Sequence, residues 1–350
     1  MKEEIIDGIK YKLPESLSEF QKKLYVHLIN WKWKNITREE GIYTEKVKGI
    51  TREYKYDAIL PESVHTKYPL IYPPILSDLL SHKEKFPFKL HQHFNHMVSS
   101  QAANVNLFLP ILLNPKVNEI IRELKSDFQS LATDQFYKGF RIEFWDGNSS
   151  YEKGLLGDHS ARSGTDSDIA IAYYNNDNEL CLWLIEHKLT EKEFTQCGGY
   201  KSDNRDDKIH LCEKSFSDIL MDKKLCYYHD VRKFNYWEIT EANKSFYVNY
   251  KKEGPCPFQG GMNQLWRNQL LGFALENEGL YKNVSFSVVH HPGNDALEGS
   301  ISRYKDLIDN NPKFSSFKSS DIINSAGRSG DKMLNNWIKW YIELYYMKSD

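Results

Sequence analysis

The chain of 350 residues has few cysteines, no long apolar run and almost no net charge. Five cysteines argue against a disulfide framework and leave free thiols or metal ligands as interpretations. No stretch approaches the roughly 20 consecutive apolar residues of a membrane span, so we expect no membrane segment. The acidic N-terminal sequence of residues 1–7 lacks the apolar core of a signal peptide, and we therefore expect a cytoplasmic location.

The charge balance argues against one broad class of nucleic-acid-binding protein. The chain has 46 Lys and Arg against 48 Asp and Glu, which gives a net charge of −2. A non-specific DNA coat protein needs a global excess of positive charge, whereas an enzyme needs only a local basic groove. The length suffices for a large core, in one elaborated domain or two.

The most informative stretch is Leu180–Lys188, an apolar run that ends in three ionisable residues. Its length and polar boundaries predict a strand buried on both faces. Because side chains alternate along a strand, Glu186 and Lys188 share a face and His187 points away. A second strand, from Ser167 to Tyr174, begins with Asp168. A charged pair at the end of a core strand needs partners or a ligand, although a structural Glu–Lys pair at a sheet edge is the simpler alternative.

Ser167-Asp168 followed by Glu186-His187-Lys188 resembles the motif of the PD-(D/E)XK nuclease superfamily, with Ser in place of the usual Pro. Residues 99–102, 167–171, 256–257 and 263–268 add to a similarity with bacterial restriction-endonuclease-like proteins of that superfamily. The resemblance covers residues 90–300. It implies an α/β fold with a PD-(D/E)XK core, in which helices flank a central mixed sheet and N-terminal and inserted segments elaborate it.

The resemblance also implies a catalytic centre that binds Mg²⁺ or Mn²⁺. Asp168 and Glu186 would hold the ion with the main-chain carbonyl of His187, and Lys188 would hold the attacking water or the scissile phosphate. Mg²⁺ in proteins often takes only one or two carboxylates, with waters and phosphate oxygens completing its coordination. Glu143, in a predicted strand over residues 140–145, is either a further metal-binding or orienting carboxylate or an exposed strand acid.

Several members of the superfamily carry Gln-x-x-x-Tyr on the helix after the catalytic strand, and this chain offers two candidates. Residues 196–200 match literally but contain two glycines, which disfavour a helix. Gln264 begins an imperfect match inside a predicted helix over residues 260–277, where Arg267 and Asn268 share its face. We favour Gln264 as a catalytic contact and Arg267 and Asn268 as DNA or phosphate contacts. Gln101, on a predicted helix that Ser99 or Ser100 caps, is a further candidate of that kind.

The cysteines after the catalytic strand have two interpretations. Four thiolates suit a structural Zn²⁺ or an iron–sulfur cluster, whereas dispersed cytosolic cysteines are more often inert small hydrophobes. No pair has the Cys-x-x-Cys spacing that would make the metal prediction specific. The histidines at 91, 93 and 96 also suggest a metal, but no pattern of acids or cysteines accompanies them. The four cysteines that could bind the structural Zn²⁺ or the iron–sulfur cluster are Cys197, Cys212, Cys226 and Cys256.

The remaining patterns divide the chain into three regions. Residues 1–88 form an accessory region with a helix over 16–33, a hairpin over 43–59 and prolines that interrupt regular structure. Residues 89–300 form the core, with a helix over 117–128, a strand over 284–289 and a cysteine-containing insertion over 190–259. Residues 301–350 form a helical region with a helix near 301–308, a Ser/Lys-rich loop and an aromatic helix over 331–347. Core packing or a homodimer face explains that last helix.

Together these features predict a metal-dependent DNA endonuclease of a restriction or phage-defence kind. One alternative is an exonuclease or nickase in DNA repair or mobile-element processing, with the same site and a different grip on the substrate. The other is a catalytically silent nucleic-acid-binding module on a nuclease fold.

Overall fold

The computed structural model describes residues 2–47, 50–146, 152–160, 163–201, 213–250 and 254–347. Its centre is a six-stranded mixed sheet in the order β10-β9-β8-β7-β5, with β6 also paired to β7. Strands β8, β9 and β10 are parallel, whereas β5, β6 and β8 run antiparallel to β7. The strands span Phe128–Leu131 (β5), Phe140–Phe144 (β6), Ser167–Asn175 (β7), Leu180–Lys188 (β8), Asn283–His290 (β9) and Phe314–Lys318 (β10).

Alternating side chains of the two central strands supply both faces of the sheet. Ile171 of β7 and Trp183 of β8 belong to one apolar cluster, and their neighbours Ala172 and Leu184 belong to a second cluster on the other face. A strand buried on both sides consists of apolar residues throughout, and this is why Leu180–Lys188 reads as an uninterrupted run.

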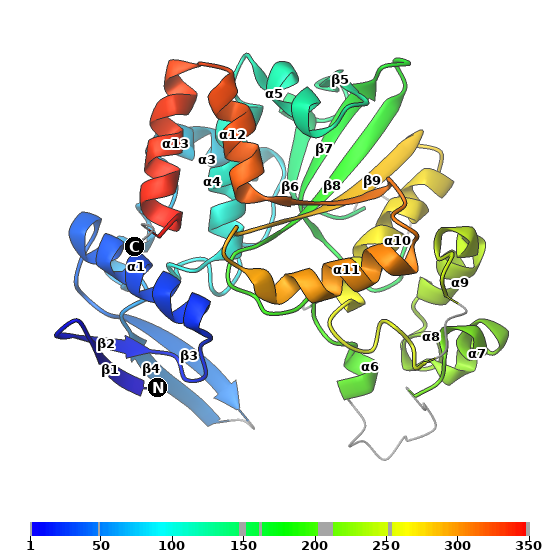
Figure 1. Ribbon diagram of the computed structural model, residues 1–350, viewed down its shortest axis with the longest axis horizontal. Helices are drawn as coiled ribbons and strands as arrows, with labels where there is room; N and C mark the ends of the chain where they lie inside the picture. The colour runs from blue at the N-terminus through cyan, green and yellow to red at the C-terminus, as the bar shows by residue number, and fades with distance from the viewer. Residues whose placement is uncertain are drawn as a thin grey trace.

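Helices cover both faces of the sheet (Figure 1). The first cluster includes side chains from α4, α5, α12 and α13, and the second includes side chains from α10 and α11. Ser99 caps α4 by accepting a hydrogen bond of 3.2 Å from the backbone N–H of Ala102. The fold is therefore a central mixed sheet flanked by helices, as predicted. These helices span Ser100–Leu112 (α4), Val117–Leu124 (α5), Asn263–Asn277 (α10), Glu298–Leu307 (α11), Ser319–Arg328 (α12) and Lys332–Tyr345 (α13).

The N-terminal region contains two hairpins and helix α1 (Figure 1). The predicted hairpin is confirmed, since β3 pairs with β4 in antiparallel register. Lys32 of α1 is buried and donates to the carbonyls of Asp57 and Ile59, which fastens the helix to the chain that follows the hairpin. The elements span Lys2–Ile6 (β1), Ile9–Leu13 (β2), Glu19–Asn35 (α1), Gly41–Val47 (β3), Ile50–Tyr56 (β4), Glu62–His65 (α2), Pro73–Ile75 (η1) and Leu76–Lys85 (α3).

Short helices occupy the segment between β8 and α10, where the insertion was predicted. Aromatic packing attaches this segment to the core, because the ring of Phe258 stacks on Trp266 of α10 at 4.3 Å and Trp237 lies 5.2 Å from the same ring. The elements here are α6 (Gly198–Lys201), α7 (Phe216–Met221), η3 (Lys223–Leu225), α8 (Tyr227–Asp230), α9 (Tyr236–Ala242) and η4 (Lys244–Phe246), and the remaining short helices are η2 (Tyr137–Gly139) and η5 (Asp295–Leu297).

Two predictions of local structure are wrong. The helix predicted to reach Phe128 ends at Leu124, and Phe128 instead begins β5. The predicted Ser/Lys-rich loop contains β10 and α12, because its few apolar side chains, including Phe314 and Ile322, are buried in the two clusters. The stretch that contains the prolines at 61, 69, 73 and 74 forms only the short helices α2 and η1, and the ten-residue helix α3 begins after it. Among the described residues, no helix is long and apolar enough to cross a membrane.

Candidate active site

A pocket of about 520 Å³ lies where β7 and β8 meet α10 and the segment before α4. The strand register explains its position, since Ile169 pairs with Ile185 and thereby brings Asp168 beside Glu186 at the ends of their strands. The described residues that line it are Tyr25, His91, His93, His96, Val98, Ser99, Ser100, Glu143, Gly164, Thr165, Asp166, Asp168, Glu186, Lys188, Thr190, Glu191, Gln264, Arg267 and Asn268.

The structure brings the three motif side chains together in this pocket. Lys188 Nζ lies 2.8 Å from Glu186 Oε1, and Asp168 Oδ2 accepts a hydrogen bond of 2.6 Å from the backbone N–H of His187. Asp168, Glu186 and Lys188 are 8%, 3% and 8% exposed. Asn104 of α4 donates to the main-chain carbonyl of Asp168 over 3.1 Å, so the helix also fixes the start of β7. The His187 ring points away from this face, as alternation predicts, and burial lowers its pKa to about 4.

Helix α10 supplies two amides to the same carboxylate. Gln264 Nε2 donates to Glu186 Oε1 over 2.6 Å, and Asn268 Nδ2 donates to Glu186 Oε2 over 2.9 Å. Both residues line the pocket, as their i and i+4 spacing predicts. Gln196, the competing candidate, instead lies 3.4 Å from Glu193 and does not line the pocket.

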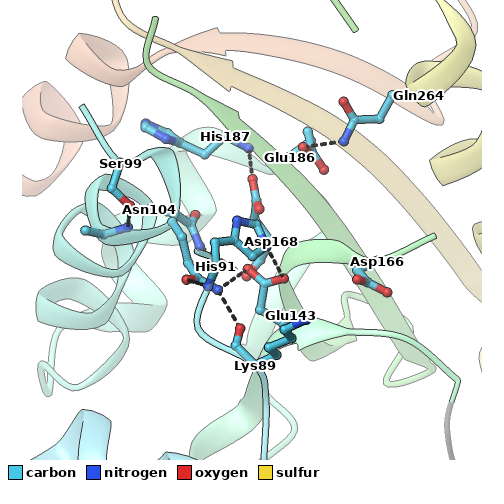
Figure 2. Close-up of polar contacts among 12 residues, drawn as sticks. Lys89, His91, Ser99, Asn104, Glu143, Asp166, Asp168, Glu186, His187 and Gln264 are labelled. Carbon is cyan, nitrogen blue, oxygen red and sulfur yellow. Dashed lines mark hydrogen bonds and ion pairs between the residues drawn. The ribbon is translucent and has the colours of Figure 1, made fainter. Parts of the chain in front are cut away.

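Glu143 lies opposite Asp168 across the β6–β7 pair, in a backbone conformation that is uncommon for a non-glycine residue. Its φ is +50°, and strain of this kind gathers at functional sites. Figure 2 shows its carboxylate beside Asp168, where it accepts from Gln101 Nε2 over 2.8 Å and lies 3.3 Å from His91 Nε2. Gln101 also bonds to the backbone of residues 89 and 91, so it holds the Glu143 carboxylate against the segment before α4.

The buried charges interact strongly. Burial, followed by the Glu186 and Glu143 carboxylates, raises the pKa of Asp168 well above its usual value. Burial likewise raises the pKa of Glu143, against the opposing effect of His91. Burial acts to lower the pKa of Lys188, but Glu186, Glu191 and Asp168 outweigh it and the pKa is raised, which keeps the ammonium charged.

The excess of acids makes the pocket a fitting place for a cation. Five carboxylic acids line it, against the two cationic side chains of Lys188 and Arg267. Among the described residues, no group of three or more His, Cys, Asp or Glu side chains is arranged to hold a metal ion. A Mg²⁺ ion needs no such group, because two carboxylates and oxygen ligands from the backbone, water or substrate suffice.

Arg267 contacts the loop before β7 as well as the pocket. Its Nη1 donates to the hydroxyl of Thr165 over 3.2 Å, and Thr165 in turn donates to the buried carboxylate of Asp158 over 2.5 Å. Tyr236 of the insertion donates to the same carboxylate over 2.6 Å. Arg267 therefore holds the pocket wall in place, a role that its spacing from Gln264 does not reveal.

The sequence reasoning gave no role in this site to Glu191 and Tyr25, and it considered His91 only as one of three histidines that suggest a metal. Glu191 follows the motif by three residues and accepts from the backbone N–H groups of Leu189 and Thr190. His91 and Tyr25 come from segments distant in sequence. A second acid after Glu186-His187-Lys188 is a signal that the sequence offers for Glu191, whereas Tyr25 has none because it sits on an ordinary amphipathic helix.

The described cysteines do not line this pocket. Cys197 and Cys226 lie in the insertion, and backbone N–H groups of the following residues point at both sulfurs. Burial raises the pKa of both thiols. Cys256 is also described, but Cys212 lies outside the described residues.

Comparisons with known proteins assign the chain to a family. Searches of curated proteins and of solved structures each gave no match. Residues 45–346 match one protein family, a wider range than the 90–300 segment that carries the motif resemblance. The chain therefore belongs to the family REase-ARP, described as "Restriction Endonuclease associating with ARP".

Proposed function

We propose that this protein is a divalent-cation-dependent DNA endonuclease of a restriction or phage-defence kind. The observation that carries the proposal is the convergence of Asp168, Glu186 and Lys188 in one pocket, with α10 amides on Glu186. Membership of a restriction-endonuclease family supports DNA as the substrate. The family description also suggests ARP as a partner, and a homodimer remains a prediction.

The proposed chemistry assigns a distinct task to each side chain. Asp168 and Glu186 would hold Mg²⁺ or Mn²⁺, with the carbonyl of His187 as a further ligand. When bound, such an ion stabilises negative charge on the phosphate and lowers the pKa of a bound water. Gln264 and Asn268 orient the Glu186 carboxylate. Lys188 is a compact cation that would orient the attacking water or the scissile phosphate. Glu143 would add negative charge on the Asp168 side of the pocket.

Cleavage of supercoiled plasmid tests the proposal. Wild-type protein should open closed circular DNA with Mg²⁺ and not with EDTA. Lys188→Ala should lose about a hundredfold to a thousandfold in rate, as expected for a group that stabilises developing charge. Lys233→Ala is the matched control, because that lysine side chain is 75% exposed and lies outside the pocket.

The same assay separates the alternatives. An exonuclease requires an end and would degrade linear DNA only. A nickase would stop at open circles. A protein that binds DNA with no cleavage under any divalent cation would be the silent binding module, and the endonuclease proposal would then fail.

A structural metal at the cysteines is a separate proposal. Its support is that Cys197 and Cys226 both lie in the insertion and that backbone N–H groups approach both thiols. Thiolates with such donors suit Zn²⁺ or an iron–sulfur cluster. Metal analysis of the purified protein tests the idea independently of any nuclease assay.

A further inference from the structure

A row of aromatic rings runs along one face of the β3–β4 hairpin. The register sets Tyr43 opposite Tyr54, and Tyr56 lies two residues further along the same face of β4. The ring centroids of Tyr43 and Tyr54 are 6.5 Å apart with an interplanar angle of 25°, and those of Tyr54 and Tyr56 are 6.3 Å apart at 35°. We call this set, together with the two histidines below, the aromatic row.

The aromatic row continues into the wall of the candidate active site. The ring of Tyr43 lies 5.5 Å from His93 and 5.8 Å from His96, and the two histidine rings are 4.8 Å apart. Both histidines line the pocket that contains Asp168 and Glu186. Five rings in contact thus lead from the hairpin to the proposed catalytic groups.

The hairpin keeps the row open to solvent. Tyr43, Tyr54 and Tyr56 are each half-buried, and the opposite face of the hairpin is also exposed, with Ile42 54% accessible. A hairpin that served only to cover a core would bury one of its faces. Arg52 lies two residues before Tyr54 on the tyrosine face and is exposed, and the strand register sets it opposite Glu45.

We infer that the aromatic row binds the bases of an unpaired DNA segment next to the bond to be cut. This inference rests on the proposed nuclease function and narrows its substrate to DNA that carries a single-stranded or splayed region. Aromatic rings stack on any base that is free to leave its neighbours, and arginine holds the backbone phosphates beside them. An intact duplex keeps its bases stacked internally and offers no free ring faces to such a row.

A binding assay with the full-length protein tests this inference. The probes are a blunt duplex and the same duplex with an unpaired tail that contains a fluorescent adenine analogue, and Ca²⁺ replaces Mg²⁺ to support binding with little cleavage. The tailed DNA should bind more tightly, and its fluorescence should be quenched by stacking. Tyr54→Ala should weaken tailed-DNA binding about tenfold and leave duplex binding unchanged. Tyr54→Phe, which keeps the ring, should bind as wild type.

The controls separate stacking from a loss of structure. Tyr137→Ala removes an exposed tyrosine outside the pocket and should change neither affinity. Equal affinity of the wild type for the two probes, an unquenched tail, or equal losses on both probes in Tyr54→Ala would overturn the inference. If the protein quenches the tail but cuts no DNA, the base-binding role of the aromatic row is supported and the nuclease proposal is contradicted. The two proposals can therefore fail separately.

Discussion

Gln264 and Glu186 are joined by a side-chain hydrogen bond of 2.6 Å across 78 residues of sequence. The bond links helix α10 to the end of β8, with the whole insertion between them. Asn268 engages the other oxygen of the same carboxylate. Helix α10 therefore fixes the direction in which Glu186 presents its charge to the pocket.

Loss of the Gln264 amide should weaken divalent-cation binding. In Gln264→Ala the Glu186 carboxylate keeps Lys188 and Asn268 as partners but can rotate, and we expect about tenfold weaker binding, typical of groups that orient a metal ligand. Calorimetric titration with Mn²⁺ measures this. Gln196→Ala is the matched control, because it removes the competing Gln-x-x-x-Tyr candidate outside the pocket. A larger effect of Gln196→Ala would reverse the choice between the two motifs.

The raised pKa of Asp168 predicts that the free energy of unfolding of the metal-free protein depends on pH. Its folded-state pKa lies above the unfolded value, so the folded state binds more protons and stability falls as pH rises from about 4 through the folded pKa. Asp168→Asn removes the ionisable group, so this fall in stability should disappear. The asparagine side-chain oxygen still accepts a hydrogen bond from the His187 N–H.

Thermal unfolding in EDTA checks this expectation. Asp168→Asn should have a Tm at least about 2 °C above wild type at pH 8, with the gap closing toward pH 4. Asp177→Asn serves as control, because Asp177 is exposed in the turn between β7 and β8 and lies outside the pocket. A gap that is constant with pH would show that the Asp168 charge does not destabilise the fold.

The sequence predicted those parts of the site that are encoded locally. The apolar run of β8 and the Ser99 cap of α4 each depend on neighbouring residues, and both were correct. Pairing of β7 with β8 then brings Asp168 to Glu186. The loop contact of Arg267 and the approach of Tyr25 depend on the folding of distant segments. Strand β10 was not predicted, because Phe314 and Phe317 are its only large apolar residues and serines separate them. Its burial by α11 and α12 cannot be inferred from the few neighbouring residues in the sequence.

Neutralisation of Glu143 should reduce metal binding and cleavage together. Glu143→Gln removes one of the two carboxylates that raise the pKa of Asp168, so the metal-free protein should become more stable while cation affinity falls about tenfold or more. Parallel Mn²⁺ titration and plasmid cleavage test this, with the exposed Glu119→Gln as control. If Glu143→Gln leaves the Mn²⁺ affinity unchanged but slows cleavage, Glu143 acts on the substrate and does not bind the ion.

Substitution of Cys226 tests the structural-metal proposal. Cys226 packs at the edge of the second apolar cluster, and the burial-raised pKa of its thiol means that without a metal the sulfur stays protonated. If a metal is bound, Cys226→Ser should reduce the metal content measured by mass spectrometry and lower the Tm substantially, because metal-binding energy is then part of the folding energy. Cys181→Ser is the contrasting variant, since Cys181 is buried within β8 and its serine replacement should destabilise the sheet without any change in metal content. Equal metal content in both variants and the wild type, including none in all three, would mean that these thiols serve only as small apolar side chains.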